Sequence, residues 1–198
     1  MGTCGVSRVN GQGGQRTSPT SDFRPIRRRG IERLARAGWG EGRSVWAADA
    51  EGRELTVDSV EVTHEPAPDA VAGVMGLDEA TDLCVRRRRF VLDGKPVLLS
   101  TSYLPADLVA NSPITQPDTG PGGVYARLAD LGHAPARFRE ELRSRMPSQG
   151  ESDRLSLPPG VPVIQLARTA FDAEGRVVEV NEMVLDSAAY VLEYDFEA

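Results

Sequence analysis

Four consecutive arginines, Arg86–Arg89, stand in an otherwise strand-like run, VRRRRFVLDGKPVLLSTS at residues 85–102. A guanidinium group offers a planar fork of N–H donors that suits carboxylate and phosphate, and it stays charged when partly buried. The run therefore indicates a candidate binding site for a small anion.

The dipeptide Asp93-Gly94 divides this stretch into two strands, because a type I′ hairpin turn needs residues that tolerate positive φ. Pairing Leu92 with Lys95 and counting outward predicts which side chains share a face of the sheet. One predicted face carries Arg87, Arg89, Ser100 and Ser102. Arg86 and Arg88 are predicted on the opposite face, where a solvated surface or ordinary ion pairs is the favoured interpretation.

Few other residues have the type and spacing that a metal site, a disulfide or a catalytic motif requires. Cys4, Cys84, His64 and His133 lie far apart, so we predict neither a metal site nor a disulfide framework. The chain contains no GxSxG or HExxH motif, and we predict no catalytic residue and no cofactor. The glycine-rich TGPGGV at 119–124 could present backbone N–H groups to an anion, but an ordinary entry into a helix is the favoured interpretation.

The length and net charge of the chain limit the classes of protein to which it can belong. With 198 residues, a net charge of −6 and a pI near 5.1, the chain suits one domain whose surface as a whole repels nucleic-acid phosphates. No stretch approaches the roughly 18 apolar residues of a membrane-spanning helix, and no signal-peptide pattern opens the chain. We expect a cytoplasmic protein without a membrane partner.

The elements that must position the arginines are predicted from hydrophobic spacing. Residues 1–24 contain few large apolar side chains, and we expect them to be disordered. From Pro25 a helical stripe predicts a short amphipathic helix that ends near Gly38. The segment RELTVDSVEVTHE alternates as a half-buried strand does, with one slip of phase between Val57 and Val60.

Helices and strands are also predicted in the rest of the chain. Apolar spacing predicts short helices in APDAVAGVMGL, PADLVANS and GGVYARLADLGH, the last of which stops at Gly132. ARFREELRSRMP predicts a strand, PSQGESDRLSLPPG a capping-type turn, and YVLEYDF the final strand.

A second hairpin is predicted in VPVIQLARTAFDAEGRVVEVNEMVLD, with its turn at Asp172–Gly175. Pairing Phe171 with Arg176 places Arg168 opposite Glu179, within reach of an ion pair. Antiparallel strands interleaved with short helices predict the fold class: α+β, with a largely antiparallel sheet flanked by short helices.

The chain resembles the UTRA effector-binding domain of GntR-type, HutC-subfamily bacterial transcription regulators. Four segments carry the resemblance in order: DGKPVLLSTSYLPADL, GPGGVYARLADLGH, LPPGVPVIQLARTAFDAEGRVVEVNEMVL and YVLEYDF. The resemblance covers residues 25–198 and implies a chorismate-lyase-like fold. It also implies a domain that binds a small-molecule effector and thereby changes how a dimer binds operator DNA.

The resemblance implies effector contacts at particular residues. Arg87 and Arg89 match an Arg-x-Arg pair of sugar-phosphate-sensing members, and Glu179 matches a carboxylate that accepts hydrogen bonds from the ligand. Tyr125 matches a tyrosine on the helix that lines the pocket. The predicted effector-binding residues are Arg87, Arg89, Ser100, Ser102, Tyr125 and Glu179. Structural alternatives stay open: ion pairs for the charged residues and core packing for Tyr125.

Three departures from the family pattern bear on the ligand. Ser100, Gly123 and Leu185 stand where the sugar-phosphate binders carry Glu, Ser and Tyr. Because the arginines remain while polar partners are lost, the predicted effector is a small anionic metabolite that is more apolar than a sugar phosphate.

Family members also carry an N-terminal winged helix-turn-helix. The segment VSRVNGQGGQRT resembles only the end of its wing. We therefore expect residues 1–24 to be a disordered tail or a remnant of that wing, and residues 25–198 to be the effector-binding domain. Operator DNA is expected as a partner only through a winged helix missing from this chain, and a homodimer is expected.

The predicted function is effector sensing and dimerisation within a bacterial transcriptional regulator. Two alternatives stay open. One is a lyase-like enzyme that acts on a small anionic substrate, for which Arg87, Arg89 and Glu179 would supply the charges; only the fold analogy supports it. The other is a structural partner that pairs with full-length regulators and binds no ligand.

Overall fold

A six-stranded antiparallel sheet forms the centre of the computed structural model, which describes residues 23–42, 45–46, 50, 52–78 and 80–195. The strand order is β2-β3-β4-β7-β6-β5. The strands are Leu55–Pro66 (β2), Asp82–Leu92 (β3), Lys95–Pro105 (β4), Arg137–Arg145 (β5), Val163–Phe171 (β6) and Val177–Asp186 (β7). The predicted α+β class with a largely antiparallel sheet is confirmed.

A second, two-stranded sheet is parallel and joins the two ends of the described chain. It pairs β1 (Ile26–Arg29) with β8 (Tyr190–Glu193), so the final strand begins where it was predicted. The single helix predicted after Pro25 is wrong, because β1 is followed by two short helices, α1 (Gly30–Leu34) and α2 (Arg36–Gly40). Ala35 between them is extended, with φ −60° and ψ 136°, which breaks the helical path. The prediction for residues 1–22 and the last position of the alternation, Phe196, lie outside the described residues.

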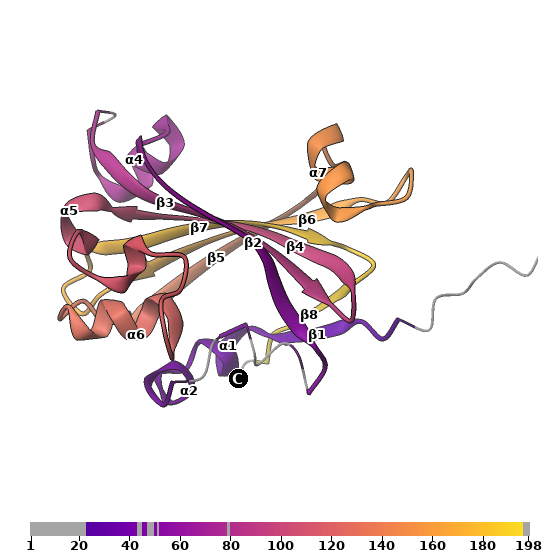
Figure 1. The fold of residues 1–198 in the computed structure, drawn as a ribbon, viewed down its shortest axis with the longest axis horizontal. Coiled ribbons are helices and arrows are strands. Elements are labelled where there is room, and N and C mark those ends of the chain that lie inside the picture. The colour runs from indigo at the N-terminus through magenta and orange to yellow at the C-terminus, as the bar shows by residue number, and fades with distance from the viewer. Residues whose placement is uncertain (1–22, 43–44, 47–49, 51, 79, 196–198) are drawn as a thin grey trace, which may run out of the picture.

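The helices cover the two faces of the large sheet unequally (Figure 1). On the face called here the outer face lie α4 (Asp69–Met75) and α7 (Gln149–Leu155). The inner face is covered by α1, α2, α6 (Gly123–Asp130) and the small sheet, with α5 (Ala106–Val109) and the 3₁₀ turn η1 (Pro113–Thr115) nearby. The predicted helices α4, α5 and α6 are confirmed, and a positive φ of 85° at Gly132 follows the end of α6.

The segment predicted as a capping-type turn is itself a helix, α7. Ser148 accepts a hydrogen bond from the backbone N–H of Glu151, whose carboxylate accepts one from the backbone N–H of Ser148. This reciprocal capping box fixes the first turn, and Leu155 then packs against the outer face beside Leu99 and Val163. The capping signal was present in the sequence, but the apolar face of the helix contains only one fully buried residue.

The hairpin β3–β4 decides where the arginines point. Its turn at Asp93-Gly94 has φ values of 50° and 77°, and Leu92 pairs with Lys95, so the predicted turn is confirmed. Further along, Val91 pairs with Pro96 but Phe90 pairs with Leu98, which leaves Val97 as an extra residue. Such a β-bulge tolerates proline, which has no N–H to give to the ladder.

This bulge overturns the predicted face of every arginine. The observed partners are Arg86–Ser102, Arg87–Thr101, Arg88–Ser100 and Arg89–Leu99. A one-residue shift moves all following side chains to the other face of a strand. The prediction that Arg87 and Arg89 share a face with the two serines is therefore wrong, and Arg86 and Arg88 share it instead.

A bulge in β2 confirms the slip of phase seen in the sequence. The register shifts between Val57 and Ser59, so Asp58 is the extra residue. Val57 lies opposite Phe90 and Val60 lies opposite Arg88, which keeps both valines on the inner face.

The second predicted register, in β6–β7, is also wrong. A shift between Ala170 and Phe171 pairs Arg168 with Asn181 and Ala170 with Glu179. The error amounts to two residues, and because side chains alternate with a period of two, Arg168 and Glu179 still lie on the same face.

Candidate effector-binding pocket

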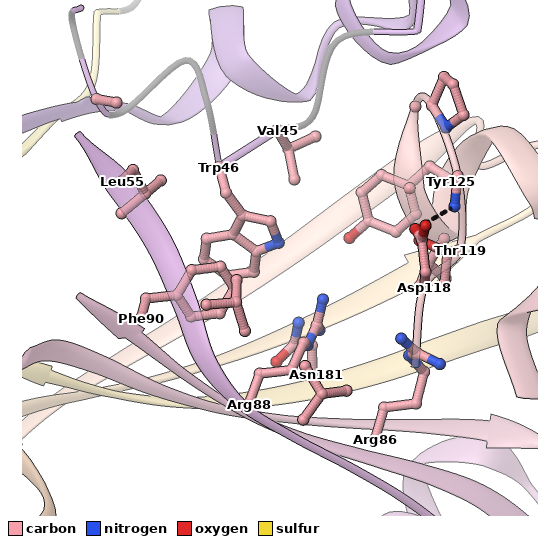
Figure 2. A pocket seen from close by; sticks show the side chains of 18 of the residues that line it. Val45, Trp46, Leu55, Arg86, Arg88, Phe90, Asp118, Thr119, Tyr125 and Asn181 are labelled. Atoms are coloured by element: carbon pink, nitrogen blue, oxygen red, sulfur yellow. Dashed lines mark hydrogen bonds between the residues drawn. The ribbon is translucent and has the colours of Figure 1, made fainter. Parts of the chain in front are cut away.

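A cavity of about 810 Å³ lies between the inner face of the large sheet and the segments that cover it. Figure 2 shows Arg86, Arg88 and Asn181 projecting from the strands toward Trp46 and Tyr125. The loop 117–122 closes one side, and the inner face of β2 forms another wall. The volume is in the range of pockets that hold small molecules.

Arg88 places a cation in this cavity that makes no hydrogen bond to a carboxylate among the described residues, although Glu179 lies near enough to stabilise its charge. Its Nη2 donates hydrogen bonds to the hydroxyls of Ser102 at 2.7 Å and Ser100 at 3.3 Å, while its buried Nε has no hydrogen-bond partner among the described residues. Burial lowers the pKa of Arg88 to about 10, so the side chain remains charged at neutral pH. A desolvated guanidinium that is held only by neutral hydroxyls favours an incoming anion.

Arg86 is the second inward-facing arginine, and it holds the pocket loop in place. Its side chain is 2% exposed and donates to the backbone carbonyls of Ile114, Gln116 and Pro117, the last at 3.0 Å. Burial lowers its pKa. Because its donors already satisfy three carbonyls, Arg86 fixes the loop that carries Asp118 and shapes the pocket.

Glu179 faces the two arginines from β7. It is 1% exposed, and its Oε2 has no hydrogen-bond partner among the described residues. Burial raises the pKa of this carboxyl, against the opposing effect of hydrogen bonds from Ser102 and Tyr125 and of the nearby Arg88. The free oxygen can accept a hydrogen bond from a ligand hydroxyl or amino group.

Tyr125 and Asn181 complete the polar floor. Burial and the neighbouring Glu179 raise the pKa of Tyr125, so its hydroxyl keeps its proton. Ser100 donates to the Oδ1 of Asn181 at 2.9 Å, which ties β4 to β7 beneath the cavity. Neutral donors and acceptors thus lie around Arg88 and Glu179.

Arg168, the third arginine of the inner face, does have an acidic partner. It is fully buried, and its Nε donates to Glu140 on β5 at 2.8 Å. Its Nη1 also reaches the hydroxyl of Tyr125 at 3.4 Å. The predicted Arg168–Glu179 ion pair is therefore replaced by an Arg168–Glu140 pair, which leaves Glu179 to the pocket.

Arg87 and Arg89 point away from the cavity, on the outer face. Arg87 forms a bidentate pair with Glu65, at 2.7 Å to each carboxylate oxygen. Arg89 binds both oxygens of Asp58, at 2.9 and 2.6 Å. Neither residue lines the pocket, because the bulge at Val97 turns both to the outer face; their contact with an effector stays a prediction.

The remaining predicted residues fall in or beneath the cavity. Tyr125 and Glu179 line it, whereas Ser100 and Ser102 lie below it and support Arg88. Sequence reasoning missed Arg86, Arg88 and Asn181, and Pro96 was the one signal that could have indicated a bulge. The binding roles of all these residues stay predictions.

The loop TGPGGV enters α6, as the favoured interpretation expected. Gly122 precedes the helix with φ 79°, and its N–H donates to the carbonyl of Gly42 at 2.9 Å. A Cβ at this position would lie 2.6 Å from the carbonyl oxygen of Trp39, so glycine is required for the close approach. The glycines therefore dock the N-terminal helices against the pocket loop.

Neither a metal cluster nor a membrane-spanning helix is found in the described residues. Within residues 23–195, apart from the gaps given above, no cluster of three His, Cys, Asp or Glu side chains could hold a metal ion. No helix in this described part of the chain is long and apolar enough to cross a membrane.

The fold and pocket define an α+β domain with a cavity on one face of its antiparallel sheet, and comparison with known proteins places it in a family. The family model of the UTRA domain matches residues 50–190. This chain belongs to the UTRA domain family of GntR-type transcription regulators.

Two related sequences are named as HTH-type transcriptional regulators. An uncharacterized HTH-type transcriptional regulator of Streptomyces coelicolor is 34% identical over 181 residues, which cover 87% of this chain and 67% of that protein. The HTH-type transcriptional regulator Rv0792c of Mycobacterium tuberculosis is 32% identical over 126 residues, covering 63% and 46% of the two chains. The chain therefore matches only part of the length of these relatives.

Solved structures share the fold. A protein assigned to the GntR family superposes with a TM-score of 0.74 at 24% identity, over 88% of this chain and 70% of that one. The effector domain of PhnF from Mycobacterium smegmatis gives a TM-score of 0.66 at 21% identity, over 77% and 93%. At these identities the likeness establishes the fold alone.

Proposed function

We propose that this chain is the effector-sensing domain of a bacterial GntR-type transcriptional regulator, and that its effector is a small anionic metabolite. The observation that carries the proposal is Arg88, a guanidinium that faces the cavity and is held by two serine hydroxyls. Its hydrogen bonds among the described residues go to these hydroxyls and not to a carboxylate, and Glu179 is its acidic neighbour only through space. The family assignment supports a regulatory role and does not favour the lyase-like alternative.

The charge balance of the pocket supports an anion. Arg86 and Arg88 both face Glu179, while Arg168 is neutralised by Glu140. An anion beside Arg88 would bring the buried charges close to neutrality, which reduces the cost of keeping a cation out of water. Glu179 would accept a hydrogen bond from a donor group elsewhere on the ligand.

A thermal-shift screen of mono- and dicarboxylates and phosphorylated sugars tests the proposal. A ligand at 100 times its dissociation constant adds about 2.7 kcal/mol to the free energy of unfolding. For each anion that stabilises the protein, Arg88→Ala should weaken binding by roughly 30-fold or more, because it removes a charged hydrogen-bonding partner.

Arg87→Ala and Arg89→Ala are the matched controls. They remove the same side chain from adjacent positions on the outer face, and we expect less than about a twofold change in affinity. Equal losses at Arg88 and Arg89, or stabilisation by none of the anions, would contradict the proposal.

We further propose that the domain forms a homodimer, since regulators that read two operator half-sites are usually symmetric. Light scattering of the whole chain at tens of micromolar tests this point. A monomer mass throughout that range would contradict it.

A further inference from the structure

We propose that the effector is an amphiphilic carboxylic acid, with its carboxylate on Arg88 and its hydrocarbon part against the inner face of β2. This inference rests on the proposed anion site and adds the chemical class of the ligand. It starts from an apolar wall that the described residues leave partly exposed to the cavity.

The wall is formed by Leu55, Val57 and Val60, which all line the cavity. The bulge at Asp58 keeps them on one face of an edge strand, opposite Phe90 and Arg88. Val57 is 42% exposed, although it faces a pocket whose floor is largely buried. Exposed apolar side chains in a concave site are the usual lining for the apolar part of a ligand.

Two aromatic rings continue the wall as far as Arg88. Trp46 and Phe90 lie with their ring centroids 4.5 Å apart, and Figure 2 shows them side by side above the strands. The guanidinium carbon of Arg88 is 5.7 Å from each ring centroid. The cation therefore stands at the border between the apolar wall and the polar floor.

This arrangement suits one ligand orientation. A carboxylate on Arg88 places the adjoining carbon chain or ring within reach of Trp46, Phe90 and the β2 wall, where burial of apolar surface is favourable. A ligand covered with hydroxyl groups would lose water there with few partners in return, because the side chains of Leu55, Val57 and Val60 carry no hydrogen-bonding group. Glu179 lies on the polar floor, where a single donor on the ligand could reach it.

A series of straight-chain monocarboxylates, from acetate through butanoate and hexanoate to octanoate, tests the inference by calorimetry on the whole chain. Each buried methylene contributes about 0.8 kcal/mol, so affinity should rise about fourfold per added carbon until the wall is covered. The corresponding primary amides carry the same hydrocarbon without the charge and should bind at least about tenfold more weakly.

Val57→Thr keeps the size of the side chain and adds a hydroxyl to the wall. It should lower the affinity for hexanoate about fivefold and leave that for acetate unchanged. Val74→Thr is the matched control, because Val74 is similarly exposed, at 38%, but lies on α4 on the outer face. Its effect on both affinities should be negligible.

The outcomes separate this inference from the proposed function. If phosphate or a dicarboxylate binds through Arg88 but chain length has no effect, the anion site stands and the amphiphilic ligand is ruled out. If affinity grows with chain length equally in wild type and Arg88→Ala, the acids adsorb without using the cation, and this inference fails; the screen of phosphorylated sugars and dicarboxylates then decides the proposed anion site separately. Absence of binding by every acid up to octanoate also overturns the inference.

Discussion

Neighbouring arginines of one strand have opposite surroundings on the two faces of the sheet. On the outer face, Arg87 and Arg89 each bind a carboxylate through two hydrogen bonds and keep about a third of their side-chain surface exposed. On the inner face, Arg86 and Arg88 are held by carbonyls and hydroxyls, and burial lowers the pKa of both.

This difference shows what an arginine contributes to stability and to binding on each face of the sheet. An exposed ion pair stabilises a protein little, because water solvates both charges well when they separate. Burying a guanidinium that is hydrogen-bonded only to neutral groups costs desolvation energy. A protein tolerates this cost where the guanidinium organises a loop or binds an anion. Changes of stability in the protein without ligand test this contrast.

The largest effect is expected from Arg86→Met, which keeps an unbranched side chain that reaches about as far as the arginine Nε but removes the donors. Three carbonyls around the pocket loop would lose their charged partner, and we expect the free energy of unfolding to fall by about 2–3 kcal/mol. Urea denaturation measures this change. Arg143→Met, at an exposed position of β5, should change it by less than about 0.5 kcal/mol; equal losses would mean that Arg86 does not hold the loop.

A smaller effect is expected for the outer pair. A double-mutant cycle of Arg87→Ala and Glu65→Ala should give a coupling free energy below about 1 kcal/mol, because Glu65 is 39% exposed and solvent screens the pair. The coupling should shrink further in 1 M salt. A salt-independent coupling above about 2 kcal/mol would show that the outer face is as desolvated as the inner one.

The smallest effect concerns pH, and it has opposite signs on the two faces. Hydrogen bonds from Arg87 lower the pKa of Glu65 from its usual value of about 4.5 to about 2. The stabilisation by Glu65 is therefore complete above pH 4.5 and is lost as the pH falls toward 2. Burial raises the pKa of Glu179, so its contribution is complete below pH 4.5 and is lost as the pH rises through the raised value.

Unfolding by urea across a pH series distinguishes the two carboxyls. Glu65→Gln should flatten the loss of stability on the acid side, whereas Glu179→Gln should flatten the loss at rising pH and raise the stability at pH 7. Each variant is the control for the other. The same change of profile in both would show that the two carboxyls share one kind of environment.

The amino-acid sequence by itself determined the turns, the strand-forming segments and the family. The turn at Asp93-Gly94 needs positive φ, which few residues tolerate. Asp172–Gly175 forms the second hairpin turn. The slip of phase between Val57 and Val60 indicated a bulge, because an apolar wall must keep one face. Glu179 and Tyr125 were identified from the family resemblance, and both line the cavity.

Only the tertiary structure decided which face each arginine occupies. Arg86 to Arg89 carry the same side chain, so no difference in polarity marks a preferred face. The register was counted outward from the turn, and a single extra residue at Val97 exchanged the arginines that share a face with Ser100 and Ser102. The two-residue error of register in β6–β7 did not change the predicted face of Glu179, because a shift of two residues returns a side chain to the same face. Side chains alternate with a period of two along a strand, so odd and even errors of register have opposite consequences for the site.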